Sequence, residues 1–406
     1  MSAPLSPKRI VVIGNGWAGS RAAAELAKKP DAGVQVTVIT PQEYQEVSLR
    51  MTKAVAAGKE EHNKALYPLA KSPGVTYVIG EVSELLPTSL KLKNGDVVQF
   101  DAALIASGTR IPIFLPGTEH TTIEARQAEI AGWTEKIAAA STIVVSGGGA
   151  VAVEIAADIK IRNKAKAVTL VANSGILPLM PKAFQERGAQ YLRQQGIDVI
   201  VGDRVPAGAA PANGSIALAS GKQVPCDLFI PATVAGPNSD FVPAEYKDAR
   251  GFVKVDETLK VTGHPGNVFA LGDVTTSAGG GGVPHLIDQS PTVLKNLLAS
   301  LKGTPLVQYK KSFPRGTVEG PMLVVLGHGE KDGLGLGPNL PGCFCTWCCF
   351  VCPCFGGPCA LPAGAASAKA KSDYNYTNWP SAAFGMSEDN KDASLNLSVH
   401  ALAMKR

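Results

Sequence analysis

The chain has 406 residues, of which 45% are hydrophobic and 18% charged, and its formal net charge is +5. This length exceeds what one hydrophobic core can organise, so we expect two or three domains. The basic residues never form a run of five, which argues against a nucleic-acid-binding surface. The sequence shows no secretory or mitochondrial signal and no charge-free apolar run of about 20 residues, so we expect a cytoplasmic protein.

The first predicted elements form a β-α-β unit. A β-branched strand at 9–13 precedes a glycine turn and a helix at 20–29, and a second strand follows at 34–40. The turn consists of Gly14, Asn15, Gly16, Trp17, Ala18 and Gly19. The glycine spacing is typical of dinucleotide binding, in which the turn and the helix N-terminus approach a pyrophosphate. Thr40 stands where an acidic residue usually binds a ribose, and Glu43 is an alternative.

A second β-α-β unit follows about 130 residues later. Its first strand is predicted at 142–146 and its last at 167–171. The three positions that are glycines in the first turn are here Gly147, Gly149 and Ala152. Neither an acid nor an arginine follows the last strand, so the sequence leaves the choice between NADH and NADPH open.

Two further strands flank the second unit. One lies within 100–117 and runs into Ser107 and Gly108, and the other lies within 266–274 and ends in Gly272 and Asp273. An aspartate at the carboxyl edge of a strand can accept a hydrogen bond from a ribityl hydroxyl, and nearby backbone amides can face phosphate or flavin oxygens.

The order of the motifs GNGWAG, ASGT, SGGGAVAVE and ALGD resembles the flavoproteins with two dinucleotide-binding domains. Within them the chain is most similar to the apoptosis-inducing-factor-like group, which includes the ferroptosis-suppressor NAD(P)H:quinone oxidoreductases. The resemblance covers roughly residues 8–335 and implies an α/β fold with two Rossmann-like domains. It implies FAD on the first turn and NAD(P)H on the second, with the nicotinamide facing the flavin.

The resemblance also implies domain limits. Residues 1–128 and 256–300 would form the FAD domain, and 129–255 the inserted NAD(P)H domain. A smaller C-terminal region would span 301–340.

Individual residues take roles from the same resemblance. Gly14, Gly16 and Gly19 would contact the FAD pyrophosphate. Arg50 and Val82 would also touch FAD, Val82 through its backbone against the adenine. Ser107 and Gly108 would line the flavin side of the domain crossing, and Asp273 would bind the ribityl chain.

The candidate catalytic residues are Glu154, near the nicotinamide and the flavin, and Lys53 as its partner. An exposed helix position is the alternative for Glu154. For His285, a structural or solvent-facing place is favoured over one beside the flavin.

Cysteine positions limit the route of the electrons. Residues 41–60, which follow the first unit, contain no cysteine, and the predicted NAD(P)H domain at 129–255 contains only Cys226. A redox-active cysteine pair is therefore missing from both units, and we expect transfer from the flavin to a small acceptor. The resemblance suggests a quinone-like molecule. The alternatives are a flavoprotein redox sensor that controls a partner, and a reductase of a small electron-transfer protein.

Seven cysteines lie between Cys343 and Cys359, within the charge-free stretch 333–368. We interpret residues 341–360 as an S-acylated hydrophobic hook for peripheral membrane contact, since Ser2 excludes N-myristoylation. Buried or unassigned structure is one alternative. Zinc held by the pairs Cys345/Cys348 and Cys349/Cys352 is another. Zinc modules usually surround their ligands with polar residues, so no metal is predicted. Residues 361–406 are predicted to be disordered, and the oligomeric state is left open.

Overall fold

The computed structural model describes residues 6–29, 33–115, 119–180, 182–277, 282–310, 324–326, 334–337 and 359–361. The predicted hook and tail lie outside these residues, except for the backbone of Cys359–Leu361. Membrane attachment through the cysteines therefore stays a prediction. Within the described ranges, no helix combines the length and the hydropathy needed to cross a bilayer.

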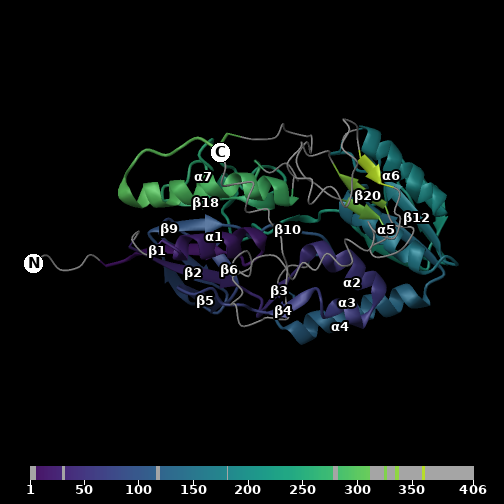
Figure 1. Cartoon of the computed structure of the whole chain (residues 1–406), viewed down its shortest axis with the longest axis horizontal. Helices are drawn as coiled ribbons and strands as arrows, with labels where there is room; N and C mark the ends of the chain where they lie inside the picture. Colours follow the sequence, from purple (N-terminus) through teal and green to yellow (C-terminus); the bar gives the residue numbers. More distant parts are fainter. Residues whose placement is uncertain are drawn as a thin grey trace, which may run out of the picture.

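A five-stranded parallel sheet forms one end of the molecule (Figure 1). Its strands, in spatial order, are β18 (Val268–Ala270), β9 (Ala102–Ile105), β1 (Lys8–Ile13), β2 (Val34–Thr40) and β5 (Val75–Ile79). Both faces of the sheet are covered, which explains why its central strands are almost continuously apolar.

Helices cover one face of this sheet and a small antiparallel sheet covers the other. The helices α1 (Trp17–Ala27) and α7 (Gly282–Lys302) share a hydrophobic cluster with Ile10 and Val12. On the other face, Val11 and Ile13 pack against a three-stranded sheet. That sheet consists of β6 (Val82–Leu85), β7 (Ser89–Leu92) and β8 (Val97–Gln99).

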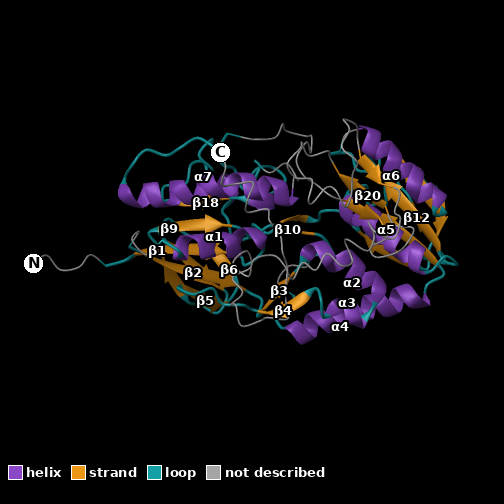
Figure 2. Cartoon of the chain, in the orientation of Figure 1, coloured by secondary structure: helices purple, strands orange, loops and turns teal. Residues whose placement is uncertain are grey.

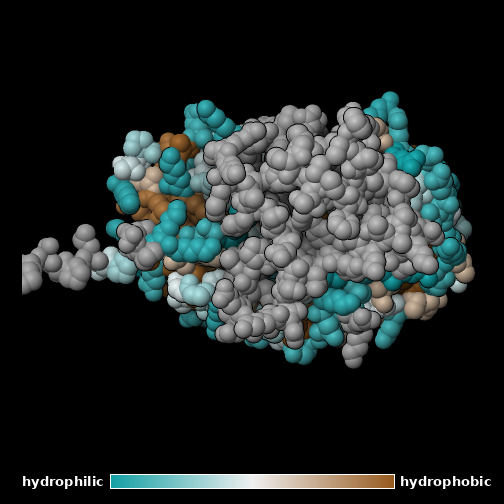
Figure 3. Space-filling view, viewed as in Figure 1, coloured by the Kyte–Doolittle hydropathy of each residue, from teal (hydrophilic) through white to brown (hydrophobic). Residues whose placement is uncertain are grey.

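A four-stranded parallel sheet forms the opposite end of the molecule (Figure 2). Its strands, in order, are β13 (Ile197–Val201), β12 (Ala167–Ala172), β11 (Thr142–Ser146) and β16 (Leu228–Pro231). The helix α5 (Ala150–Arg162) packs on this sheet, and the amphipathic α6 (Lys182–Gln194) lies beside β13. Hydrophilic side chains cover the outer edge around α6 (Figure 3). A hairpin of β14 (Ser215–Ala217) and β15 (Gln223–Pro225) lies beside β11.

A strand pair and a shared hydrophobic cluster join the two ends of the molecule. The strands β10 (Thr109–Arg110) and β17 (Gly236–Pro237), which carry the chain between the two sheets, pair with each other. The buried helix α2 (Met51–Ala57) packs against both α5 and α4 (Ile123–Ala139), so both halves contribute to one hydrophobic cluster.

The remaining elements are short. Near α2 lie β3 (Tyr44–Glu46), β4 (Leu66–Pro68), the 3-10 turn at Ser48–Arg50 and α3 (Lys59–His62). Two further 3-10 turns span Ala244–Tyr246 and Gly272–Val274. The strands β19 (Val324–Leu326), β20 (Leu334–Gly337) and β21 (Cys359–Leu361) form an antiparallel sheet.

The predicted elements agree with these bounds in most places. The strand predicted at 34–40 is β2. The first helix begins at Trp17 rather than at Ser20, because extended Gly16 is its N-cap and accepts a hydrogen bond from the Ser20 amide. The predicted domain limit at 128/129 falls inside α4, and the domain limits stay predictions.

Candidate functional site

Two glycines of the first turn are required by the packing of the polypeptide itself. Gly14 has a φ of +100°, and an ideal Cβ there would lie 2.7 Å from the Ala106 carbonyl oxygen. A Cβ on Gly19 would lie 1.9 Å from the Gly14 carbonyl oxygen. These contacts bring the start of α1 close to the end of β1, so only glycine fits at either position.

Gly16 differs, because the space beside it is open. A Cβ there would meet no atom within 4 Å, and the residue is exposed with an ordinary φ of −68°. It caps α1 without a side-chain hydrogen bond, and the first turn of α1 has no acidic residue. Free amides at a helix N-terminus attract an anion. Beside them, both polar atoms of the Asn15 carboxamide are buried without a partner in the described structure. This cradle fits a pyrophosphate.

The second turn repeats this arrangement. Gly147 has a φ of +127°, and its ideal Cβ would lie 2.8 Å from the Ala232 carbonyl oxygen and 3.0 Å from the Ala152 Cβ. Gly149 caps α5 with open space around its Cβ position, and the first turn of α5 has no acidic residue. The turn therefore offers a second anion cradle at a helix N-terminus.

One glycine of the second turn was missed by sequence reasoning. A Cβ on Gly148 would lie 2.0 Å from the Gly175 carbonyl oxygen, and the Leu177 amide donates to the Gly148 carbonyl at 2.6 Å. The loop after β12 therefore lies directly against the turn. The triple glycine in the sequence was the available signal, but its partner Gly175 could not be read from it.

Three predicted groups meet at one edge of the five-stranded sheet. The first turn follows β1, Ser107 follows β9, and Gly272 and Asp273 follow β18. These are neighbouring parallel strands, so their carboxyl ends share an edge, which is where open α/β sheets bind ligands. Val82 begins β6, three residues after β5 ends at this edge, and its side chain packs in the cluster beneath the three-stranded sheet. Its contact with FAD stays a prediction. The side chain of His285 lies outside the described structure.

Asn238 joins the two chain segments that run between the halves of the molecule. The Ser107 hydroxyl donates to the Asn238 carbonyl at 2.6 Å, and the Asn238 carboxamide donates to the Ser107 carbonyl at 2.9 Å. The Asn238 amide also donates to the carbonyl of Gly108, which has a φ of +69°. Sequence reasoning missed Asn238, because its partners lie about 130 residues earlier in the chain.

Arg50 and Lys53 both form ion pairs with Glu61, a residue that was not predicted from the sequence. The Arg50 Nη2 lies 3.3 Å from Glu61 Oε2, and the Lys53 Nζ lies 3.4 Å from Glu61 Oε1. Lys64 adds a third cation at 3.0 Å. Burial alone would raise the pKa of Glu61, but the hydrogen bond from Lys64 and the three positive charges outweigh it and lower that pKa. Burial lowers the pKa of Lys53, with Glu61 opposing.

Glu154 is buried, with 8% of its surface exposed, on the helix that packs against α2. The alternative of an exposed helix position is therefore wrong. Lys53 forms an ion pair with Glu61. The catalytic roles of Glu154 and Lys53 stay predictions.

Cys226 is fully buried in a cluster with Val144 and Val171. Burial raises the pKa of its thiol, which makes it a poor nucleophile. In the part of the chain that the structure describes, no group of three or more His, Cys, Asp or Glu side chains is arranged to hold a metal ion.

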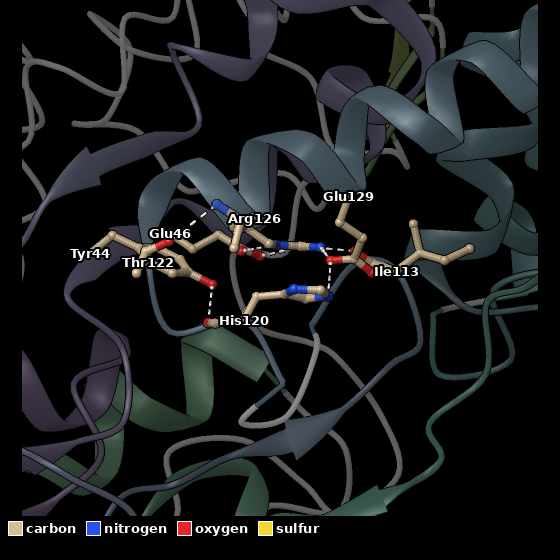
Figure 4. A network of polar contacts seen from close by, with 8 residues as sticks. Tyr44, Glu46, Ile113, His120, Thr122, Arg126 and Glu129 are labelled. Atoms are coloured by element: carbon tan, nitrogen blue, oxygen red, sulfur yellow. Dashed lines mark hydrogen bonds and ion pairs between the residues drawn. The ribbon is translucent and has the colours of Figure 1, made fainter.

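A buried ionic network, also missed by sequence reasoning, lies where α4 begins (Figure 4). The guanidinium of Arg126, which has no exposed surface, donates to Glu46 at 2.8 and 3.2 Å and to the Ile113 carbonyl at 2.7 Å. It also pairs with Glu129, which His120 contacts at 3.1 Å. Burial raises the pKa of Glu46, and Arg126 opposes that rise.

Comparison with known proteins identifies the family. Residues 8–295 match the pyridine nucleotide-disulphide oxidoreductase family. The chain belongs to this family. Its members and structural neighbours bind FAD and NAD(P)H. The two cradles described above provide one phosphate-binding turn for each of these cofactors. The predicted family, fold class and cofactors are thereby confirmed.

Individual relatives of the family agree with this assignment. The chain is 28% identical to oxidoreductase ptaL of Pestalotiopsis fici over 328 residues, which cover 75% of the chain and 87% of that protein. It is 25% identical to human (Homo sapiens) ferroptosis suppressor protein 1 over 345 residues, with coverages of 80% and 87%. The sulfide:quinone oxidoreductase of Aquifex aeolicus shares the fold, with a TM-score of 0.68 and 17% identity over 95% of this chain and 94% of that chain.

Replacing Gly149 with valine is expected to impair NAD(P)H binding selectively. The side chain fits the free turn but occupies the space that the phosphates would enter, so the KM for the nicotinamide should rise at least about tenfold. FAD content should be unchanged, because the first turn is untouched. Absorbance at the flavin bands and steady-state kinetics test both expectations. Loss of FAD with an unchanged KM would mean that the two turns have the opposite assignments.

Proposed function

We propose that this protein oxidises NAD(P)H through FAD and passes the electrons to a quinone-like small molecule. Two observations together carry the proposal. The chain has two dinucleotide cradles, and residues 1–342 contain one cysteine, Cys226, which is buried. Without a redox-active cysteine pair in these residues, a small acceptor that reaches the flavin directly is the simplest electron outlet.

The residues of the chain would act mainly by binding and orientation. The N-termini of α1 and α5 would hold the phosphates of the two cofactors. The Ser107–Asn238 contacts would fix the crossing between the halves, and bound FAD supplies the two-electron chemistry. NAD(P)H provides two electrons and one proton, and the quinone takes up a second proton from solvent to become the hydroquinone.

The test is steady-state oxidation of NADH and NADPH by the purified holoprotein with a water-soluble quinone. We expect quinone-dependent turnover with one hydroquinone formed for each nicotinamide oxidised. The variant Glu154→Gln should retain FAD but lower kcat at least about tenfold if this buried carboxylate lies beside the reacting groups.

A matched control is Glu186→Gln, since Glu186 is exposed on α6, and it should leave kcat unchanged. Reduction of the flavin by NAD(P)H without quinone-dependent turnover would contradict the proposal and favour the redox-sensor hypothesis. Turnover only with a small electron-transfer protein would favour the reductase hypothesis.

A further inference from the structure

The turn after β18 is held by two buried side chains. Gly272 has a φ of +78°, and its amide donates to Gln289 Oε1 at 2.8 Å. Its carbonyl accepts a hydrogen bond from the Thr275 hydroxyl at 2.9 Å. Gln289 is 0% exposed and Thr275 is 1% exposed. The two peptide groups that flank Gly272 are therefore each held by a side chain: Leu271–Gly272 through its N–H, and Gly272–Asp273 through its carbonyl.

Gln289 also reaches the other end of this loop. Its Nε2 lies 3.5 Å from the Ser277 hydroxyl, so one carboxamide from α7 contacts residues on both sides of Asp273. Rotating a fully buried amide away would leave its own polar atoms and the Gly272 amide without partners, which is costly. The carboxamide therefore restricts the orientation of the Leu271–Gly272 peptide, which leads directly into Asp273.

Asp273 is the residue expected to bind the ribityl chain of FAD, and it directly follows Gly272, whose amide Gln289 holds. We infer that Gln289 is a positioning residue for FAD: by fixing the Gly272 peptide, it aims Asp273 toward the edge of the sheet that carries the first turn. This inference rests on the binding of FAD at that edge. Gln289 acts through the turn and has no part in electron transfer itself.

The chain offers a matched control on the same helix. Asn296 is also 0% exposed. Its carboxamide donates to the carbonyls of Thr258 and Val307 at 2.9 and 2.8 Å, and accepts from the Val307 amide at 2.8 Å. Asn296 therefore holds loops that do not include the Gly272–Asp273 turn. Replacing Gln289 or Asn296 with leucine leaves buried backbone groups without hydrogen-bond partners. Only the change at Gln289 removes a contact to the Gly272–Asp273 turn.

The experiment compares the rate of FAD release from the holoprotein in Gln289→Leu and Asn296→Leu, with thermal unfolding measured for both. We expect FAD release to accelerate at least about tenfold in Gln289→Leu and less than about twofold in Asn296→Leu, at a similar loss of thermal stability. The visible circular dichroism of the flavin should change only in Gln289→Leu. Gln289→Glu keeps an acceptor for the Gly272 amide and should restore most of the FAD retention.

A second variant keeps the inference testable if Gln289→Leu does not fold. Thr275→Val removes the side-chain hydrogen bond to the Gly272 carbonyl, on the other side of Gly272, with little change in volume. The Thr275 amide still donates to that carbonyl at 3.0 Å, so FAD release should accelerate, but less than in Gln289→Leu. Equal release rates in Gln289→Leu and Asn296→Leu, or an unchanged rate in Thr275→Val, would overturn the inference. Wild-type protein that cannot bind FAD at all would instead refute the cofactor assignment.

Discussion

Replacing Gly16 with valine is expected to remove FAD from the protein while leaving the polypeptide folded. The structure has room for the side chain, and the φ of −68° is one that valine adopts readily. The same side chain would occupy the space in which the pyrophosphate meets the N-terminus of α1, so FAD content should fall below about a tenth of the wild-type value. The ratio of flavin to protein absorbance measures the loss, and circular dichroism checks the fold.

Gly132→Val provides the control for this experiment. Gly132 lies on α4, and its ideal Cβ also meets no atom within 4 Å. Valine has a higher helix propensity than glycine, so this change should not destabilise α4 and should leave FAD content unchanged. If Gly16→Val retains full FAD occupancy, the assignment of the first turn is wrong.

Replacing Arg126 with leucine is expected to destabilise the protein severely. The change leaves Glu46 and Glu129 without the buried guanidinium that both contact. Breaking a buried ion pair by removing one partner typically costs about 3–5 kcal/mol, because the remaining charge is uncompensated. Urea unfolding followed by circular dichroism should therefore show a much lower midpoint than in the wild type.

Two further variants separate this effect from a general loss of charge. Arg9→Leu removes the arginine from the partly exposed pair with Asp101 and should change the free energy of unfolding by less than about 1 kcal/mol. The double variant Arg126→Leu/Glu46→Leu should regain part of the stability lost in Arg126→Leu, because one buried charge is removed. An unfolding midpoint of Arg126→Leu equal to that of Arg9→Leu would contradict the expected role.

The glycine turns could be predicted because their signal is local. A strand, a turn and a helix lie within about 20 residues, and Gly19 contacts Gly14 within the same unit. The bounds of β2 were predicted correctly for the same reason. The start of α1 was placed too late, because the extended conformation of Gly16 determines it and composition does not reveal that conformation.

The contacts that the sequence did not reveal join distant segments. Arg126 lies 80 residues from Glu46, and each looks like an ordinary surface charge on its own element. Gln289 lies 17 residues from Gly272, on a different element. Periodicity identifies the buried face of a helix, but it does not show which polar residue on that face meets a partner from elsewhere. Such pairs depend on how the elements pack together.

The position of α2 limits how modular this protein can be. The helix comes from the N-terminal half of the chain, yet Met51, Ala54 and Val55 pack in the same cluster as residues of α5 and the four-stranded sheet. An excised segment 129–255 would leave that surface of α5 uncovered and prone to aggregation. Exchange between relatives of the half predicted to bind the nicotinamide, in the laboratory or in evolution, therefore requires a compatible α2 in the recipient. A change of coenzyme preference is then easier to reach through substitutions after β12 than through recombination of whole domains.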